Sequence, residues 1–132
     1  MNKQEEIISA TCLLFSVANA DEILEDKEVE SIKEIIIDFF QLEDYNNIKK
    51  TLDAAKEKFD NSIDIFEFSR VLNDQWNYQD KIDFICCTFE VAYSDGELHY
   101  IEENIIKKIA TILNVNFQDL IKAKMEIKKY LK

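Results

Sequence analysis

Apolar residues recur at intervals of three and four along most of the chain, and short polar stretches interrupt this pattern. Such an interval is typical of a helix with one face turned toward a core. The pattern predicts seven helices, at about residues 3–19, 27–40, 45–59, 63–75, 78–94, 100–113 and 117–131. The links between them are short, so consecutive helices are expected to be antiparallel neighbours. The predicted fold class is therefore all-α, with one helical domain over residues 1–132.

The apolar positions also predict which side chains face the core. In the two C-terminal helices the expected inward positions are Ile101, Ile105, Ile109, Ala110, Leu113, Phe117, Leu120, Ile121, Met125 and Leu131. Before the fourth helix, Asp64 and Glu67 have the spacing of a capping box, in which two side chains bond the free N–H groups of a helix start. The fourth helix is therefore expected to begin close to Asp64.

Two parts of the chain share residues at a fixed offset of 74 positions. The identical pairs are Ile8/Ile82, Cys12/Cys86, Phe15/Phe89, Val17/Val91, Ala18/Ala92, Asp21/Asp95, Leu24/Leu98, Glu28/Glu102, Ile32/Ile106, Lys33/Lys107 and Ile35/Ile109. These identities predict an internal duplication of a helix–turn–helix unit. The units would span about 3–40 and 78–114, be bridged by helices at about 45–75, and pack about a pseudo-twofold axis.

The polar pairs of this repeat lie at its turns. Gly96, the only glycine, follows Asp95 where one helix must end, and glycine accepts the left-handed conformation that closes helices. One interpretation is structural: Asp95 fixes the turn and Glu102 caps the next helix. The other is a cation site. Oxygen ligands favour Ca²⁺, Mg²⁺ or Mn²⁺ over Zn²⁺, and four further carboxylates lie close in sequence, namely Glu25, Asp26, Glu97 and Glu103.

The composition narrows the classes of function. A net charge of −11 argues against direct binding of nucleic acid, which requires neutralisation of phosphates. No window is long and apolar enough for a transmembrane span. The apolar stretch Ser9–Ala20 follows Glu5 and Glu6, whereas a signal peptide begins with positive charge. The chain is therefore expected in the cytoplasm.

The remaining candidate residues favour ordinary structural roles. Cys12, Cys86 and Cys87 lie in apolar helical stretches without metal-ligand spacing, which predicts buried, reduced thiols. His99 is the only histidine and has no accompanying nucleophile motif. Trp76 is expected to cover the core, although exposure together with Tyr78 would suggest a partner site.

The last expected helix carries Lys122, Lys124, Lys128, Lys129 and Lys132. Lysines at a helix C-terminus complement the helix dipole. A basic amphipathic end could instead touch an anionic membrane surface. We favour the first interpretation, because the apolar face is short and the acidic majority of the chain is repelled by anionic lipid.

The segment Val91-Ala92-Tyr93-Ser94-Asp95-Gly96-Glu97-Leu98-His99, with Glu102, Ile109-Ala110 and Leu113 after it, resembles the TerB-like (tellurite resistance protein B) family, in its short single-domain bacterial branch. In the first half Ala18-Asn19-Ala20-Asp21 matches, but Glu22 replaces the usual glycine. The resemblance implies an all-helical fold with an internal repeat and a role in a bacterial stress response. It also implies a metal site on Asp21, Glu28, Asp95 and Glu102.

The function expected from these features and from the resemblance is that of a non-enzymatic helical module of a stress response related to tellurite resistance, which binds protein partners or a divalent cation. The alternative is a dedicated cation binder or sensor built on the acidic residues of the two turns. An enzyme is a third hypothesis, disfavoured because no nucleophile–base pair, phosphate loop or cofactor motif is present. The sequence leaves the partner, the cation and the oligomeric state open.

Overall fold

A computed structural model describes residues 3–19, 26–43, 45–61, 64, 66–94 and 97–130. All regular structure in these ranges is helical, which confirms the predicted fold class. The helices are α1 (Lys3–Ala18), α2 (Asp26–Phe40), α3 (Tyr45–Asp60), α4 (Glu67–Gln75), α5 (Tyr78–Ala92), α6 (Tyr100–Ile112) and α7 (Phe117–Tyr130).

The predicted boundaries agree closely with these helices, except at the start of α4. That helix begins at Glu67, and the predicted capping box is wrong. The Asp64 carboxylate accepts a hydrogen bond from the Phe66 amide at 3.0 Å and from the Arg70 guanidinium at 2.8 Å. The bond from Arg70 is the main reason that the pKa of Asp64 is lowered. Asp64 therefore fixes the backbone just before α4 instead of capping the helix at Glu67.

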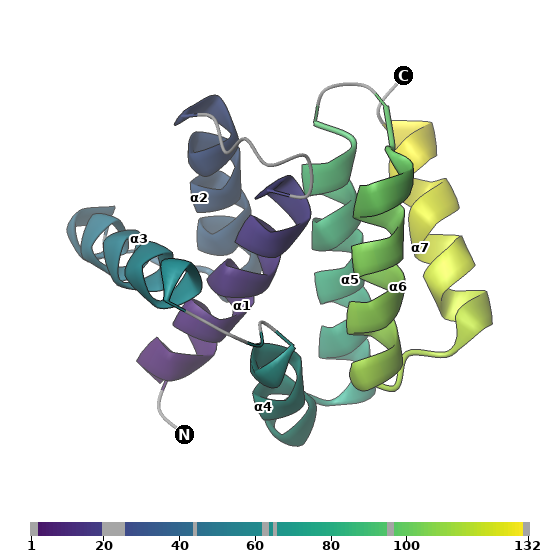
Figure 1. Ribbon diagram of the computed structural model, residues 1–132, viewed down its shortest axis with the longest axis horizontal. Coiled ribbons are helices and arrows are strands. Elements are labelled where there is room, and N and C mark those ends of the chain that lie inside the picture. The colour runs from purple at the N-terminus through teal and green to yellow at the C-terminus, as the bar shows by residue number, and fades with distance from the viewer. Residues whose placement is uncertain are drawn as a thin grey trace.

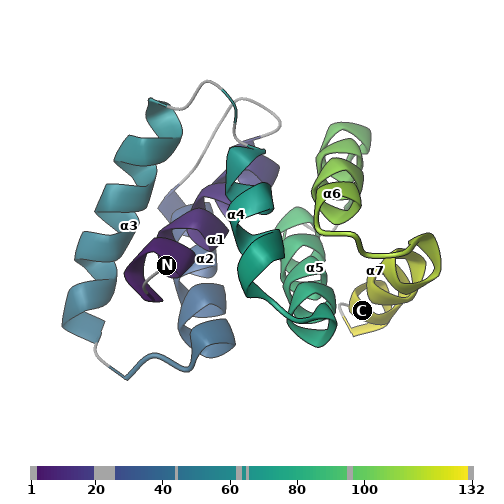
Figure 2. The same ribbon diagram turned by 90° about the horizontal axis from the view of Figure 1, so that it is seen from below.

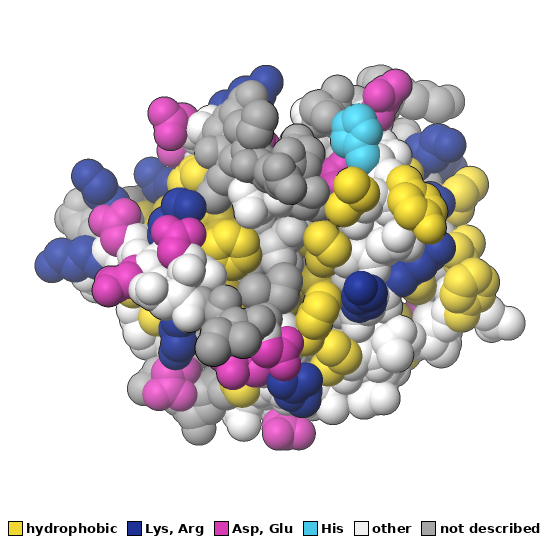
Figure 3. All heavy atoms as spheres, in the orientation of Figure 1, with side chains coloured by type: hydrophobic (Ala, Val, Ile, Leu, Met, Phe, Trp, Pro, Cys, Tyr) yellow, Lys and Arg dark blue, Asp and Glu magenta, His cyan; other side chains and the backbone are white. Residues whose placement is uncertain are grey.

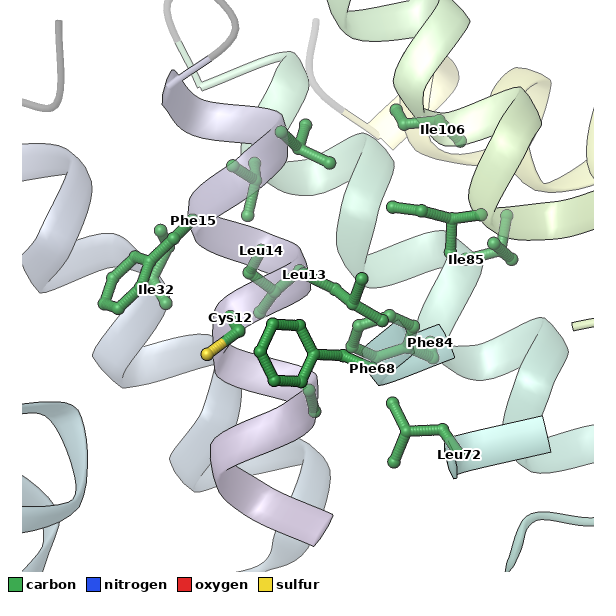
Figure 4. Close-up of a cluster of buried hydrophobic side chains, with 14 of the residues drawn as sticks. Cys12, Leu13, Leu14, Phe15, Ile32, Phe68, Leu72, Phe84, Ile85 and Ile106 are labelled. Carbon is green, nitrogen blue, oxygen red and sulfur yellow. The ribbon is translucent and has the colours of Figure 1, made fainter. Parts of the chain in front are cut away.

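Helix α1 lies at the centre of the fold. Its residues from Ser9 to Ala18 are all buried, because α1 contacts α2, α3, α4, α5 and α6. A helix that is hydrophobic on every side is typical of a core position. Figure 4 shows Leu13, Leu14 and Phe15 of α1 among side chains from α2, α4, α5 and α6. The chain is therefore built around its first helix.

The other helices lie on two sides of α1, with α2 and α3 on one side and α5, α6 and α7 on the other. In Figures 1 and 2, α3 and α7 lie at opposite ends of the molecule, with α1 and α5 between them. Helix α5 contacts α1, α2, α6 and α7, and α4 contacts α1 and α6. As a result α7 depends mainly on α5 for its packing, whereas α3 depends on α1 and α2.

Helices α2 and α6 end in the same way. Gln41 and Asn114 follow them with φ angles of 53° and 62°. The amide of Leu42 donates to the carbonyl of Ile37 at 3.0 Å, and that of Val115 donates to the carbonyl of Ala110 at 2.9 Å. These are Schellman motifs, which satisfy the last carbonyls of a helix through one left-handed residue. Gln41 and Asn114 adopt here a conformation that glycine takes more easily.

Three side chains that were expected in the core lie at the surface. Ile101, Phe117 and Met125 are 56%, 67% and 57% exposed, so these inward assignments are wrong. Each lies on α6 or α7, on the side of the molecule opposite α3 in Figure 1. Helical spacing marks these positions as apolar, but nothing in the described part of the chain covers them. Leu131 lies outside the described residues.

The two predicted repeat units share several structural features. Helices α1 and α5 end at Ala18 and Ala92, and α2 and α6 begin at Asp26 and Tyr100, in each case 74 positions apart. The pair Phe15/Phe89 is buried at both positions, and so is Ile32/Ile106. The duplication and its twofold axis stay predictions, as does the division into repeat units.

Candidate functional site

The predicted cation site lies where the two hairpins turn. The C-terminal ends of α1 and α5 and the first turns of α2 and α6 all lie at the upper side of Figure 1. Two of the four predicted ligands, Asp21 and Asp95, lie outside the described residues, as does Gly96. The structure therefore describes Glu28 and Glu102, which occupy the first turns of α2 and α6.

Glu102 is the best-defined residue of this site. Only 9% of its surface is exposed, which makes it the one acidic residue in the buried set of the described chain. Its carboxylate accepts a hydrogen bond from the backbone N–H of His99, the N-cap of α6, at 3.2 Å. The expectation that Glu102 caps this helix is thereby confirmed. A carboxylate at a helix N-terminus is also stabilised by the positive end of the helix dipole.

Glu28 holds the corresponding position on α2 and is only half-buried. It makes further interactions with its surroundings, as do Glu97, His99 and Glu102. The two turns therefore place the paired glutamates in different environments, one enclosed and one closer to solvent.

The additional carboxylates considered for this site behave differently from one another. Glu103 is turned toward α7, where it forms an ion pair with Lys124, and it also lies 3.9 Å from Lys107. Those two ammonium groups neutralise Glu103, so it is a poor cation ligand. Asp26 and Glu97 are exposed, and Glu25 lies outside the described residues. Among the residues that the structure describes, no three or more His, Cys, Asp or Glu side chains are grouped to hold a metal ion.

The cysteines show no catalytic activation. All three are free thiols; Cys12 is buried, whereas Cys86 and Cys87 are only half-buried, which corrects the prediction for the last two. Burial raises the pKa of Cys12 to about 12 and, with repulsion from Glu126, that of Cys86 to about 11. A reactive cysteine needs a lowered pKa, because the thiolate is the nucleophile. These thiols are protonated at neutral pH.

Trp76 and Tyr78 do not form an exposed pair. Trp76 is buried, and its indole N–H donates to the carboxylate of Glu6. The Tyr78 hydroxyl donates to Asp119 at 2.6 Å and accepts from the amide of Asn116 at 3.1 Å, which ties α5 to the start of α7. Trp76 therefore covers the core, as expected.

A surface that the sequence did not reveal lies along α6. Ile101, Ile105 and Ile112 follow each other at helical spacing, and all three are at least partly exposed. Figure 3 shows hydrophobic side chains gathered over this helix. Beside Ile112, a pocket of about 310 Å³ is lined by Phe66, Lys107, Lys108, Thr111 and Ile112. We call Phe66 and the three isoleucines the α6 stripe. The signal that could have found it is the apolar spacing along α6, from which Ile101 and Ile105 were predicted to face the core.

Lysines border the α6 stripe. The ammonium group of Lys108 lies 6.0 Å from the centre of the Phe66 ring, within the range of a cation–π interaction. Lys107 lines the same pocket and is exposed. In a chain of net charge −11, this is a locally basic border around an apolar surface.

The geometry defines the class of the protein as an all-helical domain with a central buried helix and with a glutamate in the first turn of both α2 and α6. No helix in the described ranges has both the length and the apolar character needed to cross a bilayer. The family model for tellurite resistance protein TerB matches residues 7–125, nearly the whole chain, and the chain therefore belongs to the TerB family. No curated protein and no solved structure gives a significant match.

Proposed function

We propose that this TerB-family chain is a non-enzymatic binding module of a bacterial stress response, active in the cytoplasm, and that its main ligand is a partner protein. The observation that carries this proposal is the α6 stripe, an apolar surface with lysines at its border. Apolar surfaces rimmed by polar residues mark interaction sites. The lysines favour a partner segment that is apolar along one face and negatively charged beside it.

The test is the size of the assembly that the chain forms in extracts of the cells that produce it. The double variant Ile101→Ser and Ile112→Ser should release the chain from its complex, because both side chains would contact the partner. The matched control is Lys27→Ser with Lys49→Ser, which changes exposed positions on α2 and α3. A complex that withstands the isoleucine substitutions, or is lost equally in the control, would contradict the proposal.

A second function, favoured by a different observation, is the binding of a divalent cation at the hairpin turns. The enclosed carboxylate of Glu102 stands at a helix start that has a counterpart, Glu28, at the start of α2. Carboxylate oxygens suit Ca²⁺, Mg²⁺ or Mn²⁺. On this proposal Asp21 and Asp95 complete the ligand set with the two glutamates, as the family resemblance implies.

Thermal unfolding tests the cation proposal. A cation present at a hundredfold its dissociation constant should stabilise the fold by about 2.7 kcal/mol relative to EDTA. Asp95→Asn should abolish the stabilisation, whereas Glu103→Gln should preserve it, because Glu103 is paired with lysines. Unfolding temperatures that are equal with EDTA, Ca²⁺, Mg²⁺ and Mn²⁺ would rule the site out.

A further inference from the structure

A second cavity, of about 350 Å³, lies between the N-terminal end of α1, the C-terminal end of α2 and the start of α5. Its lining combines carboxylates with aromatic rings: Lys3, Glu6, Asp38, Phe39, Phe40, Trp76, Asp80 and Asp83. In Figure 1 the N-terminal end of α1 and the start of α5 lie at the lower side of the molecule, away from the hairpin turns. We propose that this cavity binds a linear alkyl diammonium, the chemical class of the polyamines.

The aromatic side of the cavity is fixed by packing. Phe39 lies 5.4 Å from Trp76 and 5.8 Å from Phe84, and Trp76 lies 5.1 Å from Phe84, measured between ring centres. Phe40 stands at the edge of this cluster, 4.9 Å from Phe39. The rings come from α2, α5 and the link before α5, so their positions are set by the core. Because Trp76 is only 7% exposed, the rings offer a narrow, rigid apolar strip that an alkyl chain can contact.

The carboxylates of the cavity exceed its positive charge. Four carboxylates, those of Glu6, Asp38, Asp80 and Asp83, face one ammonium, that of Lys3. Glu6 is engaged by the Trp76 indole. Among the described residues, no ion pair involves Asp38, Asp80 or Asp83. The cavity therefore carries a net negative charge that a cation of more than one charge would balance.

The chain itself shows which chemistry the cavity accepts. The ammonium group of Lys3 lies 5.0 Å from the centre of the Phe40 ring, a cation–π geometry. Lys3 is thus an alkylammonium already seated on the aromatic rim. A ligand with the same end group and a second ammonium would occupy this position and also reach the aspartates on α2 and α5.

The arrangement fits an extended organic cation better than a metal ion. The carboxylates come from three helices, and in the described chain they do not form a group that could hold a metal. A metal ion needs several oxygens at about 2–2.6 Å, whereas a diammonium places separate charges against separate carboxylates. The charge of Asp38 also acts on Glu90 of α5, whose pKa is raised first by burial and then by that charge.

Trp76 provides the measurement, because it is the only tryptophan of the chain and lines the cavity. Titration with cadaverine should give saturable binding, followed by Trp76 fluorescence and by calorimetry. Pentylamine, which has the same chain length and one ammonium, should bind about tenfold more weakly, since it lacks the second charge. Lys3→Met should tighten cadaverine binding by about threefold, because it frees the Phe40 ring.

Two matched variants decide whether the site is specific. Asp38→Asn with Asp83→Asn should weaken cadaverine binding by about tenfold or more. Asp53→Asn with Glu57→Gln removes the same charge from exposed positions on α3 and should leave binding unchanged. Circular dichroism of both variants establishes that they fold. The proposal is overturned if calorimetry detects no binding, if both variants bind equally weakly, or if pentylamine or Mg²⁺ binds as tightly as cadaverine.

Discussion

The α1–α2 and α5–α6 hairpins have related sequences but expose different side chains. Helix α1 is covered by five other helices and lies in the core, whereas its hairpin partner α2 buries only Ile32 and Ile36. Helix α6 is covered on one side only and exposes Tyr100 and Ile101 in its first turn. The corresponding positions on α2 are Asp26 and Lys27. The comparison teaches that a shared pattern of core residues fixes how a hairpin packs, while the unshared surface residues decide what it can bind.

The two hairpins also differ in the sequence of their turns and in the burial of the glutamate that follows each turn. The second hairpin has Gly96 after its aspartate and encloses Glu102, whereas the first has Glu22 at the glycine position and leaves Glu28 half-buried. The helix after the second turn therefore begins with the more enclosed glutamate of the two. Four sets of substitutions test this comparison, beginning with the largest expected effect.

Truncating a core phenylalanine should lower the free energy of unfolding equally in the two hairpins. Phe15 and Phe89 are each 1% exposed. Phe15→Ala and Phe89→Ala should each lower the free energy of unfolding by about 4 kcal/mol, because each removes a buried aromatic side chain and leaves a cavity. Urea unfolding measures both. A loss several times larger at one position would show that the two hairpins do not share the core equally.

Replacing Glu28 and Glu102, the corresponding glutamates of the two hairpins, should lower the free energy of unfolding by different amounts. Glu102→Ala should lower the free energy of unfolding by about 1–2 kcal/mol, because it removes a buried side chain that accepts a hydrogen bond from the His99 amide. Glu28→Ala should cost about half as much, since that side chain is closer to solvent. Glu102→Gln is the control, because glutamine keeps an acceptor oxygen and should recover most of the loss. Equal losses at the two positions would remove the distinction between the turns.

The free thiols of Cys12 and Cys86, which occupy corresponding positions in the two hairpins, make the free energy of unfolding depend on pH. Burial raises the pKa of Cys12 to about 12 and that of Cys86 to about 11, from 9.0, so both stay protonated in the folded chain when the unfolded chain begins to ionise. The stability that these thiols contribute is complete below pH 9 and is lost as the pH rises through 9–11 and 9–12. Cys86→Ala should reduce the loss of stability between pH 8 and 10 by about 1 kcal/mol. An unchanged loss would place Cys86 in contact with solvent.

The smallest effect concerns the contact between α6 and α7. Lys124 pairs with Glu103, whose counterpart on α2 is Val29. Lys124→Met should lower the free energy of unfolding by about 0.5 kcal/mol at low salt and less at high salt, because the pair is partly exposed. Lys122→Met, at an exposed position on the same helix, should change it by less. Equal effects from the two lysines would mean that the ion pair contributes nothing.

The sequence predicted the helices because their apolar spacing and polar breaks are local signals. It failed at the start of α4 because the side chain of Asp64 bonds Phe66 and Arg70, and spacing alone does not distinguish these partners from Glu67. It also placed Ile101, Phe117 and Met125 in the core, because a periodic pattern shows that a face is apolar but not whether another helix covers it. The capping role of Glu102 could be predicted, since it depends on neighbours along the chain. The cavity of Lys3 and Trp76 could not, because it joins residues far apart in sequence.

The most direct test of a functional difference between the hairpins is site-specific photo-crosslinking in the cells that produce the protein. A photoreactive phenylalanine analogue would replace Ile101 in one variant and Lys27, its exposed counterpart on α2, in the other. The account predicts one crosslinked protein from position 101 and none from position 27, and loss of that product when Ile112 is changed to Ser. Crosslinking to the same protein from position 27 alone, or equally from both positions, would contradict it.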